Sequence, residues 1–316
     1  MISLASRLLA FIYFRLSVFS RPYLRRVHKK FFSSRSEIKI ESTKNPEMEQ
    51  TEIDELKNRG FLNIELNEET SKIFKQVELK INNAINNEKD SPKGSVTKNY
   101  LKRIDLDNHP DIIQLGLQLV LSRQILDYAY GYLGEKPLLT EFKVLVSDTN
   151  DEPVGSQLFH CDFDDERMLK VFVYINKVTK DHGPLQAIDK DSSERIRAET
   201  KYRYGVEGGT GISSHSDKYG QLGEKGYTEF LAEAGDVTLI DAAGCFHRGS
   251  RRCQMPRVVL YGSYCTRSSY RFPPFNRVID TDYLLRIGSP MHIYKNFYPE
   301  KSSYLINDVQ PNSKQD

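Results

Sequence analysis

The chain of 316 residues is long enough to bury a core, and its 39% apolar content, with 11% aromatic residues, excludes an intrinsically disordered protein. Lys and Arg total 45 against 43 for Asp and Glu, so the net charge of +2 gives the whole chain no electrostatic basis for binding nucleic acid. The 4 cysteines lack C-x-x-C spacing and the density of a small secreted scaffold, which favours a reducing, cytoplasmic environment.

The N-terminal segment has a composition of its own. Residues 1–36 mix short apolar runs with Arg and Lys and contain no acid. The apolar run between Arg7 and Arg15 is too short for a membrane span of about 20 residues. Two interpretations stay open: a basic amphipathic segment that makes peripheral contact with an anionic membrane surface, or a solvated or docked helix. Residues 37–55 are polar and predict a linker, so residues 1–55 form a basic segment plus linker.

Residues 56–136 are predicted to be mainly helical. The stretch FLNIELNEETSKIFKQVELKINNAINN (residues 61–87) indicates a short strand followed by a helix. The stretch PDIIQLGLQLVLSRQILDYAYGYLG predicts one helix that begins at Pro110 and ends at Gly131 or Gly134.

From residue 137 to residue 275 the pattern changes to short apolar or alternating runs that end at turn residues. Strands at this spacing, without helices between them, predict an antiparallel sandwich or barrel. Residues 192–226, rich in Ser, Gly and charge, read as a long insertion of the kind that is often functional. Residues 276–316 form a C-terminal extension.

His160 and Asp162 are candidate metal ligands in the stretch QLFHCDFDDE (residues 157–166). Two positions apart on a strand, they would point to the same face. Iron(II) in oxygenases is held by two His and one carboxylate on one face of the ion, which leaves positions for co-substrate and oxygen. The following acids, Asp164, Asp165 and Glu166, are predicted to form a solvated turn.

His247 has the setting expected of a third ligand. It lies near the end of GDVTLIDAAGCFHRGS (residues 235–250), where a strand between two turns can deliver a side chain to the mouth of a barrel. Arg257 opens the next strand, and its planar fork could grip the far carboxylate of 2-oxoglutarate. The alternative is that His160 is a structural strand residue and His247 a surface loop residue. The other histidines lie in the N-terminal segment, turns, the insertion or the tail: His28, His109, His182, His215 and His292.

Two long stretches, residues 157–188 and 235–264, resemble the phytanoyl-CoA dioxygenase family of iron(II)/2-oxoglutarate oxygenases. The resemblance covers about residues 137–270. It includes Gln157 before the His-x-Asp pair, the DHGPL turn and AGDVTLID before the distal His. It implies a mainly β protein with flanking helices and a double-stranded β-helix (jelly-roll, cupin-like) core, in which residues 56–136 belong to the catalytic domain.

By the same resemblance, His160, Asp162 and His247 would bind Fe(II), and Arg257 would pair with the 2-oxoglutarate carboxylate. Gln157 would face the same pocket. The family often has a hydroxyl residue two positions after the Arg, where this chain has Val259, so Ser263 or Tyr261 is expected to replace that contact. Weaker pocket candidates, for which an outward-facing position is the alternative, are Lys143, Tyr174 and Thr238. Cys161 is expected to face away from the site, and Cys245 to be a small packing residue.

The function implied is hydroxylation of a C–H bond in a small-molecule substrate, lipid-like or a secondary metabolite, with O2 and 2-oxoglutarate as co-substrates. Halogenation is disfavoured because halogenases of this family replace the carboxylate ligand, and Asp162 is present. Two alternatives stay open: a cupin-type metal-dependent hydrolase or isomerase without 2-oxoglutarate, and a non-catalytic jelly-roll binding module.

Overall fold

A computed structural model describes most of the region between residues 50 and 266. The described residues are 50–87, 101–104, 106–134, 137–147, 155–162, 165–200, 202, 226–249 and 254–266. The expectations for residues 1–49, for most of the 192–226 insertion and for the C-terminal extension lie outside them.

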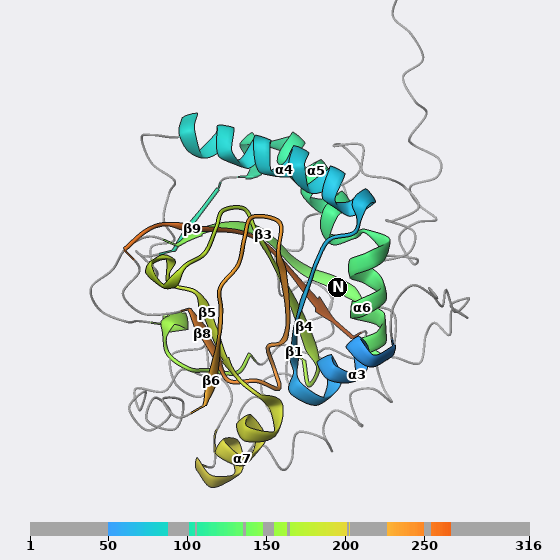
Figure 1. The fold of residues 1–316 in the computed structure, drawn as a ribbon, viewed down its shortest axis with the longest axis vertical. Helices are drawn as coiled ribbons and strands as arrows, with labels where there is room; N and C mark the ends of the chain where they lie inside the picture. Colours follow the sequence, from blue (N-terminus) through green and yellow to red (C-terminus); the bar gives the residue numbers. More distant parts are fainter. Residues whose placement is uncertain are drawn as a thin grey trace, which may run out of the picture.

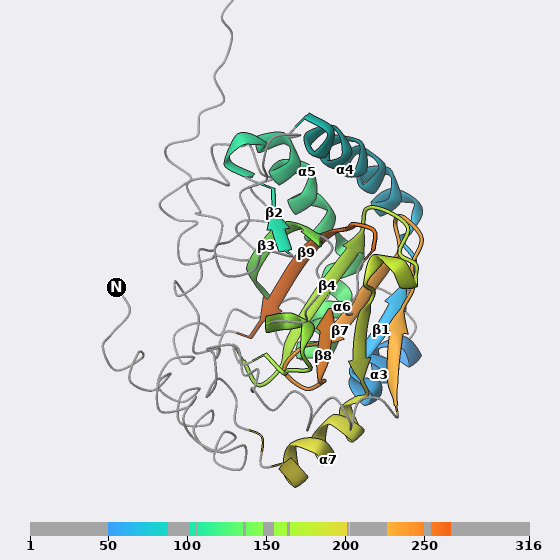
Figure 2. The ribbon, with the colours of Figure 1, turned by 90° about the vertical axis from the view of Figure 1, so that its left-hand side faces the viewer.

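The described strands form two antiparallel sheets (Figures 1 and 2). The larger sheet has the order β1-β7-β4-β9-β3-β2, and the smaller one has the order β6-β5-β8. In the larger sheet the strands are β1 (Phe61–Ile64), β2 (Leu101–Arg103), β3 (Leu138–Ser147), β4 (Met168–Tyr174), β7 (Val237–Asp241) and β9 (Arg257–Cys265). In the smaller sheet they are β5 (Leu185–Ile188), β6 (Tyr227–Phe230) and β8 (His247–Gly249).

The chain passes back and forth between the two sheets. It runs through β3, then through an isolated bridge between His160 and His247 beside the smaller sheet, and then through β4. It continues through β5 and β6 in the smaller sheet, β7 in the larger, β8 in the smaller and β9 in the larger. This alternation of antiparallel strands is a jelly roll, the double-stranded β-helix. The predicted fold class, mainly β with flanking helices, is confirmed.

Helices lie outside this core. The α-helices are α3 (Gln50–Arg59), α4 (Glu68–Asn87), α5 (Pro110–Val120), α6 (Arg123–Leu133) and α7 (Lys190–Thr200), and short 3-10 turns are η2 (Leu106–Asn108), η3 (Gly155–Gln157) and η4 (Lys180–His182). The single helix predicted over residues 110–134 is two helices, because Ser122 has an extended ψ of 153° and interrupts the helical backbone. The predicted linker also ends early, since α3 already begins at Gln50.

Strand alternation gives the larger sheet two different faces. On β4, Val171 and Val173 belong to the apolar core shared with α4, α5 and α6, which lie over the outer face of the sheet (Figure 1). The approach is close, because a side chain at Gly116 of α5 would collide with Phe142 of β3. The alternate residues Lys170, Phe172 and Tyr174 therefore point the other way, into the barrel. The helices thus bury the outer face and leave the inner face for a site.

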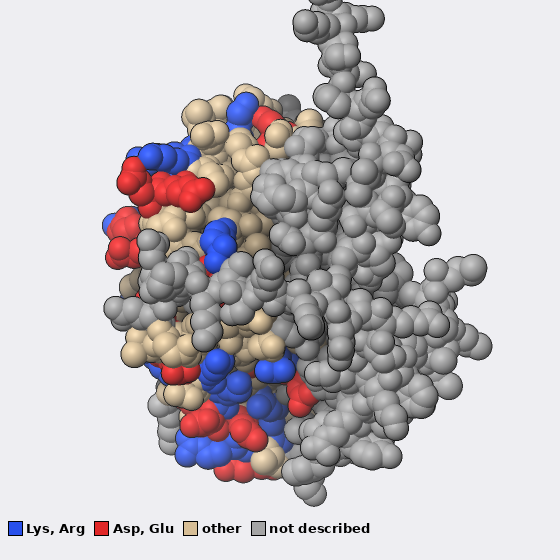
Figure 3. Space-filling view, turned by 90° about the vertical axis from the view of Figure 1, so that its right-hand side faces the viewer, with Lys and Arg blue, Asp and Glu red and all other residues tan. Residues whose placement is uncertain are grey.

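Lysine, arginine and acidic side chains lie side by side on the described part of the surface seen in Figure 3, consistent with the near-zero net charge. Within the described ranges, no helix is both long and apolar enough to cross a bilayer.

Candidate metal centre

His160, Asp162 and His247 come together inside the barrel, with one ligand atom from each lying within 4.8 Å of the others. The backbones of His160 and His247 form two hydrogen bonds: His160 N donates to the His247 carbonyl at 3.1 Å, and His247 N donates to the His160 carbonyl at 2.9 Å. Asp162 N donates to the Ala242 carbonyl at 2.7 Å. The strand ladder therefore places residues that are distant in sequence beside one another before their side chains interact.

Hydrogen bonds to the backbone orient both imidazoles. Nδ1 of His160 lies 2.8 Å from the Leu158 carbonyl, and Nδ1 of His247 lies 3.1 Å from the Cys245 carbonyl. A carbonyl only accepts, so each Nδ1 donates a proton and the neutral ring keeps its lone pair on Nε2. These Nε2 atoms face the Asp162 carboxylate at 3.8 and 3.7 Å. Metal-binding histidines are oriented in the same way.

The electrostatics of the site favour the protonation states that a metal requires. Burial, together with the neighbouring His160, lowers the pKa of His247 to about 3, against the opposing effect of the Asp162 carboxylate. Burial alone would raise the pKa of Asp162, but Lys170 and the two histidines hold that pKa well below its usual range. His247 is therefore neutral and Asp162 ionised at neutral pH, as metal ligands must be.

A turn behind the site holds the segment that leads to His247. The Asp241 carboxylate accepts hydrogen bonds from the backbone N–H groups of Ala243 and Gly244, at 3.2 and 2.9 Å. Its other oxygen accepts from the Tyr132 hydroxyl of α6, and the buried Arg197 of α7 donates to the Gly244 carbonyl. Flanking helices thereby help to position the ligand segment.

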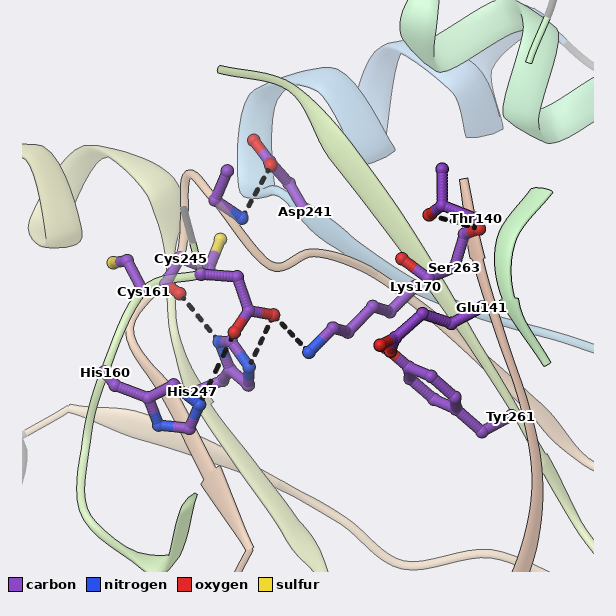
Figure 4. Close-up of polar contacts among 12 residues, drawn as sticks. Thr140, Glu141, His160, Cys161, Lys170, Asp241, Cys245, His247, Tyr261 and Ser263 are labelled. Carbon is purple, nitrogen blue, oxygen red and sulfur yellow. Dashed lines mark hydrogen bonds and ion pairs between the residues drawn. The ribbon is translucent and has the colours of Figure 1, made fainter. Parts of the chain in front are cut away.

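The inner face of the larger sheet carries charge next to the ligands (Figure 4). The Lys170 ammonium forms an ion pair with Asp162 Oδ2, and Lys170 is directly opposite Ser263 on β9. Ser263 is in turn opposite Glu141 on β3. Glu141 pairs with Lys143 Nζ at 2.8 Å and accepts a hydrogen bond from the Tyr261 hydroxyl at 3.1 Å. Lys143 thus lies on the pocket side of its strand.

Arg257 lies at the other end of β9. Its Nη2 donates to Ser147 Oγ at 3.3 Å, across the pair that these residues form between β9 and β3. The same nitrogen is 3.6 Å from the position of a side-chain carbon added at Gly249, which is two residues from His247 on β8. The guanidinium therefore lies against β8, the strand that carries His247. Its point of contact, Gly249, is about 7 Å along that strand from His247.

The structure changes the expectation for the hydroxyl partner of Arg257. Ser263 is six residues further along β9, which corresponds to ~20 Å of extended strand, so it cannot hold the same carboxylate as Arg257. The Tyr261 hydroxyl donates a hydrogen bond to the Glu141 carboxylate rather than lying beside Arg257. Ser147, which sequence reasoning missed because it lies on another strand, offers its hydroxyl group beside Arg257.

The remaining candidates lie in several surroundings. Thr238 is opposite Phe172 in the register of β4 and β7, so it lies on the inner face with Tyr174, and the two hydroxyl groups are 3.2 Å apart. Neither residue faces outward. Gln157 is buried at the end of η3. Cys161 is a hydrogen-bond acceptor for Arg197 and packs in a separate apolar cluster, facing away as expected. Cys245 packs in a cluster with Phe61 and Ile240 and others.

The prediction of a fully solvated acidic turn after Asp162 is wrong for Asp165. This residue is 2% exposed, and its carboxylate accepts hydrogen bonds from the backbone N–H and the hydroxyl of Thr266, at 2.8 and 2.7 Å. Buried acids are retained where such bonds replace water. Asp165 therefore ties the end of β9 to the segment that follows the first ligands.

Lys170 and Glu141 are further site residues that sequence reasoning passed over. A signal was present: Lys170 is the one charged residue in the strand MLKVFVY, which is otherwise apolar except for the terminal Tyr. A charged side chain in such a strand indicates an interior polar site when both faces of the sheet are covered.

No family model and no curated protein matches the chain. Among solved structures, it is similar to the non-heme alpha ketoglutarate dependent carbocyclase SnoK from nogalamycin biosynthesis, with 15% identity, 69% of this chain and 84% of that one covered, and a TM-score of 0.48. It is similar to EctD from S. alaskensis with 2-oxoglutarate and 5-hydroxyectoine, with 14% identity, coverage of 71% and 77%, and a TM-score of 0.46. It is also similar to HygX from Streptomyces hygroscopicus with nickel and 2-oxoglutarate bound, with 13% identity, coverage of 69% of this chain and 87% of that one, and a TM-score of 0.44. At such similarity the fold assignment rests on the strand order of the chain itself.

Proposed function

We propose that the protein is an iron(II)- and 2-oxoglutarate-dependent dioxygenase that hydroxylates a C–H bond of a small-molecule substrate. The observation that carries the proposal is the convergence of two imidazole Nε2 atoms and one carboxylate inside a jelly roll, with Arg257 against the strand of His247. This set of ligands, two His and one carboxylate, is the one that non-heme iron oxygenases use.

The residues present fit the metal. Both rings are held in the tautomer that offers Nε2, and Asp162 supplies a negative charge to balance a divalent cation. Bound iron(II), with O2, supplies the oxidising chemistry, in which 2-oxoglutarate is converted to succinate and carbon dioxide as the C–H bond is hydroxylated.

The chain itself contributes binding and orientation. Arg257 would bind the far carboxylate of 2-oxoglutarate, and Ser147 would hold the guanidinium in place from the opposite strand. Tyr174 would line the same end of the pocket. Burial raises the pKa of its phenol, and the Arg257 guanidinium partly opposes this rise, which indicates that the two side chains are close to each other. The helices outside the larger sheet exclude water from that side.

Anaerobic titration with iron(II) and then 2-oxoglutarate tests the proposal. We expect a weak visible charge-transfer band with the wild-type protein, its loss in His160→Ala, and its retention in His109→Ala, a matched change at the start of α5. Metal binding without a band on adding 2-oxoglutarate would instead favour a cupin-type hydrolase or isomerase. Failure to bind metal would leave the non-catalytic binding module.

A further inference from the structure

Lys170 interacts directly with the candidate metal centre. Its ammonium pairs with Oδ2 of Asp162, a member of the candidate ligand set, and its side chain is only 13% exposed. Both histidine Nε2 atoms lie within 3.8 Å of the same carboxylate. The ammonium therefore supplies positive charge that compensates the Asp162 carboxylate.

A second carboxylate lies on the other side of the Lys170 ammonium. Lys170 and Glu141 occupy one cross-strand row, with Ser263 between them. The Lys170 Nζ is 5.5 Å from the centre of the Tyr261 ring, whose hydroxyl is bonded to Glu141. Burial alone would raise the pKa of Glu141, but Lys143, Lys170 and Tyr261 together lower it below its ordinary value. Glu141 is therefore an anion within the electrostatic reach of Lys170.

We propose that Lys170 is a positioning residue of the metal centre: its ammonium holds Asp162 between the two imidazoles when no metal is bound, and moves to Glu141 when a metal arrives. The inference rests on the metal site of the proposed function, but not on 2-oxoglutarate. A divalent cation at the three ligands would repel an ammonium in contact with one of them, so the ion pair must open. Four methylene groups give Lys170 the freedom to turn along the row.

The proposal predicts opposite effects of two substitutions on metal affinity. Lys170→Gln removes a competitor for Asp162 and should tighten binding of nickel(II), whereas Glu141→Gln removes the acceptor for the displaced ammonium and should weaken it. Each change should be on the order of 10-fold, at the low end of what residues behind metal ligands contribute. In the double variant, the effect of Glu141→Gln should disappear, because no ammonium remains to be displaced.

Calorimetric titration of the full-length chain with nickel(II) alone measures these affinities, and circular dichroism checks the fold. Lys177→Gln and Glu233→Gln are matched controls, because these residues form an exposed ion pair at 2.5 Å. Lys170→Arg, which keeps the charge, should bind nickel(II) closer to wild type than Lys170→Gln does. A purely structural lysine would lower metal affinity when replaced, together with the thermal stability.

Each outcome decides the question. Unchanged or weaker nickel(II) binding by Lys170→Gln would overturn the proposal, as would a Glu141→Gln effect that persists in the double variant. If Lys170→Gln does not fold, Glu141→Gln alone still decides, since unchanged or tighter binding there would overturn it. If wild type binds no nickel(II), binding by Lys170→Gln supports the proposal, and absence of binding there too overturns it. Tighter metal binding without a 2-oxoglutarate band would refute the proposed function and leave this inference standing.

Discussion

Substitution of Arg257 gives the most direct test of the co-substrate site. Arg257→Gln keeps much of the side-chain stem but removes the charge. A hydrogen bond to a charged group contributes about 1.5–3 kcal/mol, so the dissociation constant for 2-oxoglutarate should rise roughly 10- to 150-fold. The upper part of this range applies if the guanidinium binds in bidentate fashion at its partly buried position between Ser147 and Gly249.

The assay is the anaerobic titration of the iron(II)-loaded protein with 2-oxoglutarate, followed by the visible band. Iron(II) affinity itself should change little in Arg257→Gln, because the guanidinium donates to Ser147 and lies against Gly249, two residues away from His247. Ser147→Ala should weaken 2-oxoglutarate binding by a smaller factor, about 2- to 12-fold, since it removes only a neutral hydrogen-bond partner of Arg257.

Ser263→Ala separates this geometry from the expectation based on sequence. Ser263 is ~20 Å along β9 from Arg257, so its hydroxyl should contribute nothing to 2-oxoglutarate affinity. Equal affinity of wild type and Arg257→Gln, or a loss in Ser263→Ala as large as that in Arg257→Gln, would refute the placement of the co-substrate.

Two further predictions concern the frame around the site. Asp241→Ala leaves two buried backbone N–H groups and the Tyr132 hydroxyl without their acceptor, at about 1–3 kcal/mol each, so we expect the free energy of unfolding to fall by roughly 3–9 kcal/mol and nickel(II) binding to weaken. Denaturant unfolding with a parallel metal titration measures both, and an unchanged unfolding midpoint would contradict the structure. Leu260 lies on the outer face under α5, so Leu260→Ala should lower the free energy of unfolding by about 2–5 kcal/mol. The folded variant should keep the nickel(II) affinity of the wild type. Loss of nickel(II) binding in this variant would argue against the separation of the core from the metal site.

Much of the fold could be predicted from local pattern. Alternating apolar residues after residue 137 indicated the strands, and the elements at Phe61–Ile64 and Glu68–Asn87 were expected as a strand and a helix. The break between α5 and α6 was missed because the apolar pattern of residues 110–134 continues across Ser122, where only the backbone changes direction. Periodicity shows which side of a helix is buried. Because α5 and α6 both pack their apolar sides against the larger sheet, the periodic pattern does not reveal where one helix ends and the next begins.

The sequence by itself determined the types of candidate ligand and their order: the spacing of His160 and Asp162, a distant His247 and an arginine that opens the next strand. Only the tertiary structure decided what surrounds them. Antiparallel register places Ser147 beside Arg257, and it places Lys170 and Glu141 in one row on either side of Ser263, with the Lys170 ammonium paired to Asp162. The physical reason is that cross-strand neighbours are set by register between segments far apart in the chain, which no local pattern records.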